Sequence, residues 1–413
     1  MNVHQQCLDE QTQYGHVVAV RLTEEQRAPD THWILLILSL LAMASVLQVN
    51  LLLPLLPRVG ETFDVGPPAL GWLQGAGAAT IALVAPWAGS WADRRGWRPA
   101  MIIGMGIQAI GLVVQTLSVS FIMLLLARVF TALGGAFLVG TSLSYISYLY
   151  PPIKRGRVLG LLGGMEAMGL VLAVPAAAFF GGVYGFRWPL GIFAVCMIGL
   201  WLLAVVKLPI TPTSPDVQVF RLSQLLEQRE RRALIFTAFL DGLVLEGALT
   251  MFPLWLELVL SWGSDDVALI FLLVGCSLVV FQPVAGVLTD RLGRVRIQLV
   301  GACGGAAVWA CLPFTEGALL EVCALSALWA AFMAMSMNAR LSLTSVLVNP
   351  STQGAFMGIF TSAWAAGACL GAVVAGQVFE RWGFSCIALL TALALSIGGI
   401  VVWTFVREPG VGA

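Results

Sequence analysis

The sequence predicts an all-α integral membrane protein with about twelve transmembrane helices in two pseudo-symmetric six-helix bundles. Hydrophobic residues make up 59% of the 413-residue chain and charged residues 11%, whereas a soluble protein carries about 25% charged residues. The apolar stretches are long enough to cross a hydrocarbon core of about 30 Å, which takes roughly 20 helical residues each. They do not alternate as outer-membrane strands do, and one loop motif recurs in each half of the chain.

Twelve apolar stretches are expected to span the membrane. They are 33–56, 69–92, 99–118, 120–148, 157–182, 187–207, 233–260, 267–289, 297–314, 319–346, 355–378 and 384–406. Three prolines and a charged run interrupt the pattern after the sixth span and indicate a linker. The expected division is a cytoplasmic N-terminal tail 1–32, a first bundle 33–207, a cytoplasmic linker 208–232, a second bundle 233–406 and a cytoplasmic tail 407–413.

Lysines and arginines gather in alternate loops. They follow the second, fourth, sixth and eighth spans, whereas the other loops carry only Arg58, Arg187 and Arg381. By the positive-inside rule the first group of loops and both termini face the cytoplasm. This predicts a multi-pass protein of the bacterial inner membrane. The zero net charge conceals this asymmetry, and no nucleic-acid partner is expected.

Short internal matches recur at almost the same offset along the chain. The matched segments are 89–96 with 286–294, 152–160 with 350–358 and 185–186 with 383–384. Each pair lies in the same loop-into-helix context. Two parallel repeats predict a pseudo-two-fold axis along the membrane normal, with a cavity where the halves meet.

The strongest match is a loop motif of glycine, aspartate and arginine. Its first copy contains Gly89, Asp93, Arg94, Gly96 and Arg98, and its second contains Gly286, Asp290, Arg291, Gly293 and Arg294. With these residues the chain resembles the major facilitator superfamily over residues 33–406. It is most similar to the twelve-span drug:proton antiporter branch. Trp97 replaces an arginine of the family motif, so Arg95 or Arg98 is expected to substitute for it, whereas the second copy keeps Arg294.

The first copy of the motif has the chemistry of a gate. Gly89 would let two helices approach backbone to backbone. Asp93 can accept charge-assisted hydrogen bonds and face the positive N-terminus of a neighbouring helix. The resemblance implies that this neighbour is the eleventh span, beginning near Gln353, and that the contact forms when the bundle opens outward. The alternative is a solvated turn with a capping aspartate.

Arg128 lies inside the fourth span, among leucines and glycines. An intramembrane arginine costs at least about 2.5–3.5 kcal/mol on insertion scales, so it should be paired or face a polar cavity. It matches the family's fourth-span arginine, and the resemblance therefore implies a part in proton coupling. A structural role, bonding to carbonyl groups of the first span, is the alternative.

Three acidic residues also fall inside spans: Glu166 in the fifth, and Asp241 and Glu246 in the seventh. A carboxyl group removed from water can hold a proton near neutral pH, so one of the three is expected to be the protonation site. Asp241 and Glu246 lie about 140° apart around an ideal helix and should face different surroundings. Arg340, in the tenth span, is expected to reach towards the inner interface.

Polar or large side chains within the spans are candidates for a substrate cavity. They are Gln48, Asn50, Gln74, Gln115, Trp329 and Asn338. Each could equally hold helices together through hydrogen bonds or packing.

These features predict a secondary active transporter of a small organic solute that works by alternating access, with proton-coupled efflux as the first expectation. The fifth span has Val174-Pro175 where the antiporter branch has a Gly-Pro pair. A proton-coupled importer of an organic solute or metal chelate, siderophore-like, is therefore the alternative, and a non-transporting membrane receptor or scaffold a further one. No nucleophile–base or metal-ligand spacing is apparent, so no enzyme activity, cofactor or metal is expected. The expected partners are the solute, protons and the lipid bilayer, and the protein is expected to be monomeric.

Overall fold

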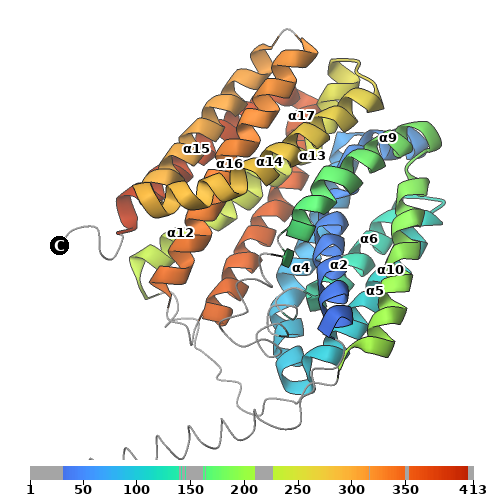
Figure 1. Cartoon of the computed structure of the whole chain (residues 1–413). Helices are drawn as coiled ribbons and strands as arrows, with labels where there is room; N and C mark the ends of the chain where they lie inside the picture. Colours follow the sequence, from blue (N-terminus) through green and yellow to red (C-terminus); the bar gives the residue numbers. More distant parts are fainter. Residues whose placement is uncertain are drawn as a thin grey trace, which may run out of the picture.

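The regular elements of the computed structural model are all helices in the residues that it describes. These residues are 31–138, 141, 145, 161–162, 164–209, 227–315, 317–348 and 353–407. Much of the expected tails and of the linker 208–232 lies outside them, so these domain boundaries stay predictions. Figure 1 shows the first bundle in blue to green and the second in yellow to red, side by side.

The first bundle contains six spans. Its elements are α2 (Thr31–Asn50), η1 (Leu53–Leu55), α3 (Leu56–Phe63), α4 (Pro67–Arg95), α5 (Trp97–Thr116), α6 (Phe121–Leu138), η2 (Gly169–Ala173), α9 (Val174–Tyr184) and α10 (Arg187–Lys207). The first span is thus longer than expected and is broken near Pro54. The π-helical turn η2 comes just before Pro175, because a proline lacks an N–H and crowds the preceding turn.

The second bundle is built in the same way. Its elements are α12 (Arg229–Asp241), η3 (Gly242–Glu246), α13 (Gly247–Leu254), η4 (Trp255–Val259), α14 (Ser264–Leu292), α15 (Arg294–Cys311), η5 (Leu312–Phe314), α16 (Leu319–Leu347) and α17 (Gln353–Phe405). The elements α12 to η4 form one interrupted span, in which η3 and η4 are π-helical.

Eleven helices in the described part are long and apolar enough to cross a membrane. The last of them runs through 50 residues, Phe356–Phe405, about 75 Å at the helical rise and far more than one crossing. Gly383, at φ 76°, breaks it into two. The described residues therefore form twelve spans in two six-helix bundles, as the sequence predicts.

The two bundles pack tightly at one end. The two loop motifs lie at one end of the bundles, here called the arginine-rich end. The tight packing is at the other end, called the opposite end, which carries the turn Asp64–Gly66 and the start of α14. At the opposite end α4 lies against α17: a Cβ added at Gly75 would lie 2.9 Å from the carbonyl oxygen of Cys369. Likewise, a Cβ on Gly275 of α14 would lie 3.0 Å from Val171 Cα of η2. Such contacts require glycine.

Towards the arginine-rich end the same four helices separate. A Cβ added at Gly89 of α4, Gly164 of the fifth span, Gly286 of α14 or Gly358 of α17 would meet nothing within 4 Å. The described structure is therefore closed at the opposite end and open at the arginine-rich end.

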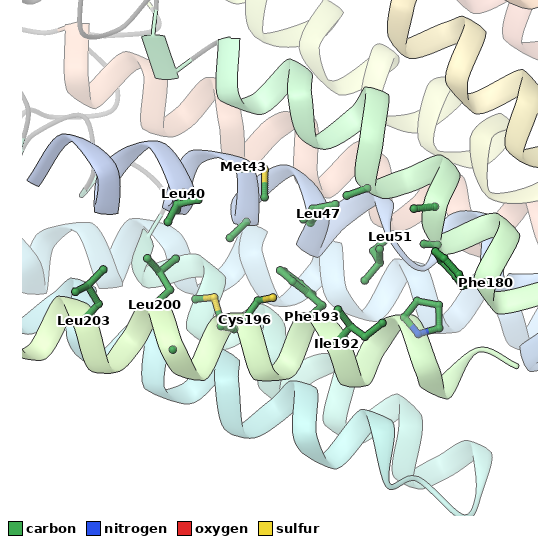
Figure 2. Close-up of a pocket in the computed structure, with 17 residues that line it drawn as sticks. Leu40, Met43, Leu47, Leu51, Phe180, Ile192, Phe193, Cys196, Leu200 and Leu203 are labelled. Carbon is green, nitrogen blue, oxygen red and sulfur yellow. The ribbon is translucent and has the colours of Figure 1, made fainter. Parts of the chain in front are cut away.

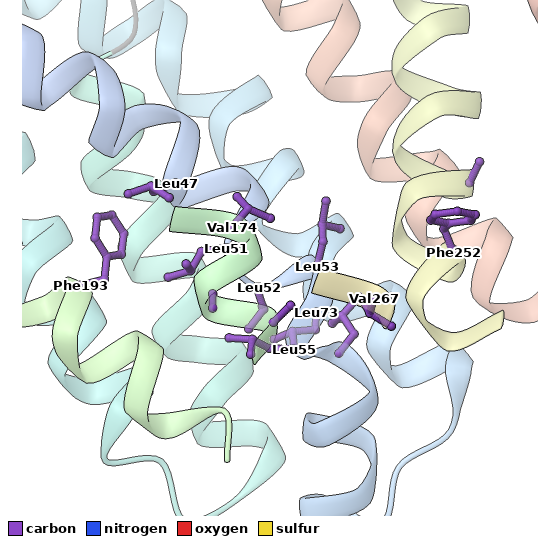
Figure 3. Packing of buried hydrophobic residues seen from close by; sticks show 14 of the residues in the cluster. Leu47, Leu51, Leu52, Leu53, Leu55, Leu73, Val174, Phe193, Phe252 and Val267 are labelled. Carbon is purple, nitrogen blue, oxygen red and sulfur yellow. The ribbon is translucent and has the colours of Figure 1, made fainter. Parts of the chain in front are cut away.

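Apolar side chains seal the opposite end. Leu53 and Leu55 of η1 and Leu73 of α4 are at most 1% exposed, and they pack in one cluster with Val267 of α14 (Figure 3). Phe252 of α13 belongs to the same cluster. Because the cluster draws on both bundles, opening this end would expose it.

Candidate functional site at the junction of the two bundles

Arg128 lies at the centre of a buried polar network in the first bundle. Its guanidinium donates from Nη1 to the carbonyl oxygen of Gln48 at 2.6 Å and from Nη2 to Oε1 of Gln74 at 3.0 Å. Gln108 Nε2 in turn donates to Gln48 Oε1 at 2.7 Å. The arginine is only 7% exposed, and Gly77 leaves room for it on α4. The network joins the first four spans.

This arrangement places Gln48 and Gln74, expected as cavity residues, among the partners of Arg128. Gln115 is 1% exposed and donates to the hydroxyl of Thr131. This bond holds α5 against α6, and a cavity position for Gln115 stays a prediction.

Glu246 faces this network from the second bundle. It ends the π-helical turn η3 and is 7% exposed. Its carboxylate and the Arg128 guanidinium are close enough for their charges to interact, but no N···O contact within 4.0 Å joins them among the described ion pairs. Opposite charges attract strongly where water is excluded. The two opposite charges therefore lie on different bundles without a direct bond between them.

Asp241 lies in a different environment from Glu246. It forms an ion pair with Arg340 of α16, and both side chains are nearly buried. The expectation that Arg340 reaches to the inner interface is wrong, because a buried carboxylate on the seventh span supplies a closer partner. A small cavity of about 20 Å³ adjoins the pair and is lined in part by Trp329, Met333 and Ser336. Trp329 thus lies beside a cavity, although it is only 6% exposed.

The remaining candidates are dispersed. Glu166 is exposed, so it is not a buried acid like Glu246. Asn50 donates to Val46 O of its own helix at 2.9 Å. Asn338 donates to Gln282 Oε1 of α14 at 2.8 Å and holds α16 against it. These three residues do not join the Arg128 network.

The two copies of the loop motif keep their glycine turns. Gly96 and Gly293 adopt φ of 100° and 95°, which a residue with a side chain would adopt only under strain. Arg98 donates to the carbonyl oxygens of Leu208 at 2.7 Å and Val205 at 2.8 Å. Arg98 therefore caps α10 inside the first bundle, and the substitution of Arg95 or Arg98 for the missing gate arginine stays a prediction.

The second copy is bonded differently. Arg294 donates from Nε to the hydroxyl of Ser342 on α16 at 2.8 Å, whereas Trp97, at the matching place, packs against the apolar cluster that contains Phe137 of α6. Asp290 and Arg291 are exposed. The side chain of Asp93 lies outside the description, as do those of residues 353–355, so its contact with the eleventh span stays a prediction.

Among the described residues nothing would meet a Cβ at Gly89 within 4 Å, so the close backbone approach expected there is not seen. The close contacts that glycines make between α4 and α17 lie at the opposite end. The glycines that bring them together are Gly71, Gly75 and Gly376.

One inter-bundle contact was not predicted from the sequence. Arg58 Nη2 lies 3.7 Å from Glu257 Oε2 of η4 and donates to Ser264 Oγ of α14 at 2.9 Å. The sequence hid this pair, because Glu61 lies only three residues from Arg58 and is the nearer acid, whereas Glu257 is about 200 residues away.

Two six-helix bundles that close at one end around buried charges form the architecture of an alternating-access membrane transporter. A sequence model described as Major Facilitator Superfamily matches residues 38–277 and 234–413. The chain belongs to the major facilitator superfamily, and it is a multi-pass membrane transporter of small molecules.

Known proteins agree with this membership. The chain is 22% identical over 361 residues to YwfA, an uncharacterized MFS-type transporter of Bacillus subtilis (strain 168), covering 85% of this chain and 86% of the relative. It is 24% identical over 268 residues to Multidrug resistance protein 2 of the same organism, covering 61% and 66%.

Solved structures share the fold. A D-xylose-proton symporter has a TM-score of 0.77 at 16% identity, covering 92% of this chain and 98% of that one. A bacterial homolog of the human lysosomal transporter Spinster, in an inward-facing and occupied conformation, has a TM-score of 0.71 at 18% identity, covering 92% and 95%.

Proposed function

We propose that this chain exports a small organic solute in exchange for protons, by alternating access. The observation that carries the proposal is the opposition of Arg128 and Glu246, two buried charges on different bundles. A proton bound by Glu246 would cancel the carboxylate charge that faces Arg128, so the attraction between the bundles depends on protonation.

This coupling has a direct structural consequence. Arg128 is anchored to the first bundle by its bonds to Gln48 and Gln74, whereas Glu246 belongs to the interrupted seventh span. The π-helical turn that ends at Glu246 is a feature that often marks functional positions in helices. Loss of the attraction would let the seventh span move relative to the first bundle. Protonation and rocking of the bundles would then be one event.

We assign the arginine-rich end to the cytoplasm, on the positive-inside rule. The structure is then inward-open, with Arg58 and the apolar cluster of Leu53, Leu55 and Val267 sealing the outer side. We further propose a bacterial inner-membrane location, cytoplasmic termini and a monomer. In the outward-open state, Asp93 and Gly89 would meet the eleventh span and close the cytoplasmic side.

Some relatives support efflux as the direction. The name of one relative, the Multidrug efflux pump LfrA of Mycolicibacterium smegmatis (strain ATCC 700084 / mc(2)155), 35% identical over 131 residues, states efflux. The name of Multidrug resistance protein 2 states drug resistance.

Transport in proteoliposomes under imposed pH gradients tests the proposal, with an aromatic cationic dye as the probe. Antiport drives dye uptake when the lumen is acidic, because outward proton flow exchanges for dye. Symport drives uptake when the lumen is alkaline. The direction of dye movement expected under each pH gradient is the same for either orientation of the protein in the bilayer. Uptake with an alkaline lumen would favour the importer, and dye movement that ignores both gradients would overturn proton coupling.

A further inference from the structure

An apolar groove of about 550 Å³ runs along the membrane-facing side of the first bundle (Figure 2). Its walls come from α2, the fifth span and α10, and none of its lining side chains carries an N–H or O–H group. Leu47 and Phe193 form the floor and are 4% and 7% exposed, whereas Phe180 and Ile192 at the rim are 43% and 54% exposed. The groove is therefore deep and open to one side.

The groove is separate from the Arg128 network. Its α2 residues, Leu40, Met43, Ala44 and Leu47, recur at helical spacing on one face of α2, and Leu51 follows directly after the helix. Gln48, which the network uses, lies on the adjoining face and points to α5 and α6. A ligand in the groove would thus contact α2 from the side away from the junction.

The dimensions of the groove suit a lipid chain. Along α10 it extends from Pro189 to Leu203, about 21 Å at the helical rise of 1.5 Å per residue. One leaflet of the hydrocarbon core is about 15 Å thick, so a chain of that leaflet fits along the groove. An apolar recess of this size that faces hydrocarbon gains dispersion contacts only when a chain fills it.

Cations lie at the arginine-rich end of the groove. Lys207, one turn beyond Leu203, is exposed, and its ammonium lies 5.7 Å from the centre of the Trp33 ring at the start of α2. Arg98 adds a second positive charge there, because it is bonded to the carbonyl oxygens of Val205 and Leu208 on either side of Lys207. Lysine and tryptophan at a helix end are typical of the membrane interface.

We propose that this groove is a binding site for one anionic phospholipid, whose acyl chain lies between α2 and α10 and whose phosphate meets Lys207. The charge of the site selects the anionic headgroup, and the shape of the groove selects a single chain. The lipid would brace α2, the helix whose Gln48 carbonyl accepts from Arg128.

Native mass spectrometry of the full chain tests this proposal, with phosphatidylglycerol and phosphatidylethanolamine added in equal amounts. Gly199→Trp places an indole in the groove at a position where a Cβ meets nothing within 4 Å. Val195→Trp is the matched control, because Val195 is 70% exposed on the same helix and outside the groove. Gly199→Leu is a smaller second variant in case the indole disturbs folding.

The wild-type protein and Val195→Trp are expected to retain phosphatidylglycerol, and both Gly199 variants to lose most of it. Lys207→Gln should abolish the preference over phosphatidylethanolamine, and Lys207→Arg should keep it. Equal retention in Gly199→Trp and Val195→Trp would overturn the site, and equal binding of the two lipids to the wild type would overturn the headgroup assignment. Dimer peaks that disappear with Gly199→Trp would assign the groove to a second copy of the chain and overturn the proposal.

Discussion

Arg58 and Glu257 connect the two bundles at the opposite end, where Nη2 of Arg58 lies 3.7 Å from Oε2 of Glu257. Arg58 also contacts Glu61, one turn away on α3, at 2.8 Å. The two carboxylates differ in surroundings: Glu61 is 57% exposed and Glu257 8%. An exposed pair contributes little, so the contact with Glu257 is the one that can hold the bundles together.

Glu257→Gln should shift the protein towards opening at the opposite end. The change removes the charge across the bundles but keeps the size of the side chain. Spin labels at Thr62 and Asp265, in a chain without native cysteines, would report a larger fraction of long distances. Glu61→Gln is the matched control and should leave the distances unchanged, since Glu61 lies in the same bundle as Arg58. The same shift in both variants would contradict the role of Glu257.

Glu246→Gln should separate proton coupling from solute movement. The amide resembles the protonated carboxyl and cannot exchange a proton, so dye uptake driven by a pH gradient should fall to the level of protein-free liposomes. Dye exchange without a gradient should persist, because the path is intact. Glu166→Gln, at an exposed carboxyl of the fifth span, should retain gradient-driven uptake. Wild-type uptake by Glu246→Gln would remove Glu246 from the coupling.

A double-mutant cycle should show that Asp241 and Arg340 stabilise the folded protein as a pair. Removing one partner leaves a buried charge alone, which costs about 3–5 kcal/mol in folded proteins. Asp241→Asn and Arg340→Met should therefore each lower the thermal unfolding midpoint strongly, and the double variant should lower it less than their sum. Additive losses would mean that the two side chains do not stabilise the bundle as a pair.

The number and order of the spans could be predicted because each one is a local property. Length, hydropathy and glycine at turns such as Gly383 indicate where a helix starts and ends. The π-helical turn before Pro175 is likewise a local feature, because proline lacks an N–H. The observed ends of the spans differ from the expected ends where a helix extends past the apolar stretch. An example is α12, which begins at the charged residue Arg229.

The pairing of the buried polar groups could not be predicted in this way. The sequence indicates that Asp241, Glu246, Arg128 and Arg340 need partners, since each is costly in hydrocarbon. Which acid meets which arginine depends on how distant helices are rotated, and the π-helical turn η3 changes that rotation between Asp241 and Glu246. The sequence also could not indicate which end of the bundles is open, because the same sequence must adopt both the inward-open and the outward-open states.

Gly71 and Gly89 of α4 should therefore have opposite effects on the conformational equilibrium. In this structure a Cβ on Gly71 would overlap the carbonyl oxygen of Ala372, whereas one on Gly89 would meet nothing within 4 Å. Gly71→Ala should weaken the closed opposite end and favour outward opening. Gly89→Ala should leave this state intact and hinder closure of the arginine-rich end, where the alternative state brings α4 against α17.

Distances between the bundles at both ends would measure these opposite effects of the two substitutions on the conformational equilibrium. Labels at Thr62 and Asp265 report the opposite end, and labels at Ser90 and Ser345 report the arginine-rich end. Gly71→Ala should lengthen the first distance and shorten the second, and Gly89→Ala should do neither but should reduce transport. Since alanine replaces glycine inside a helix with a gain of about 0.5–1 kcal/mol, lost transport in Gly89→Ala would not come from lost helix stability. Full transport by Gly89→Ala would mean that α4 and α17 never meet at Gly89, and the proposed cytoplasmic gate would have to close elsewhere.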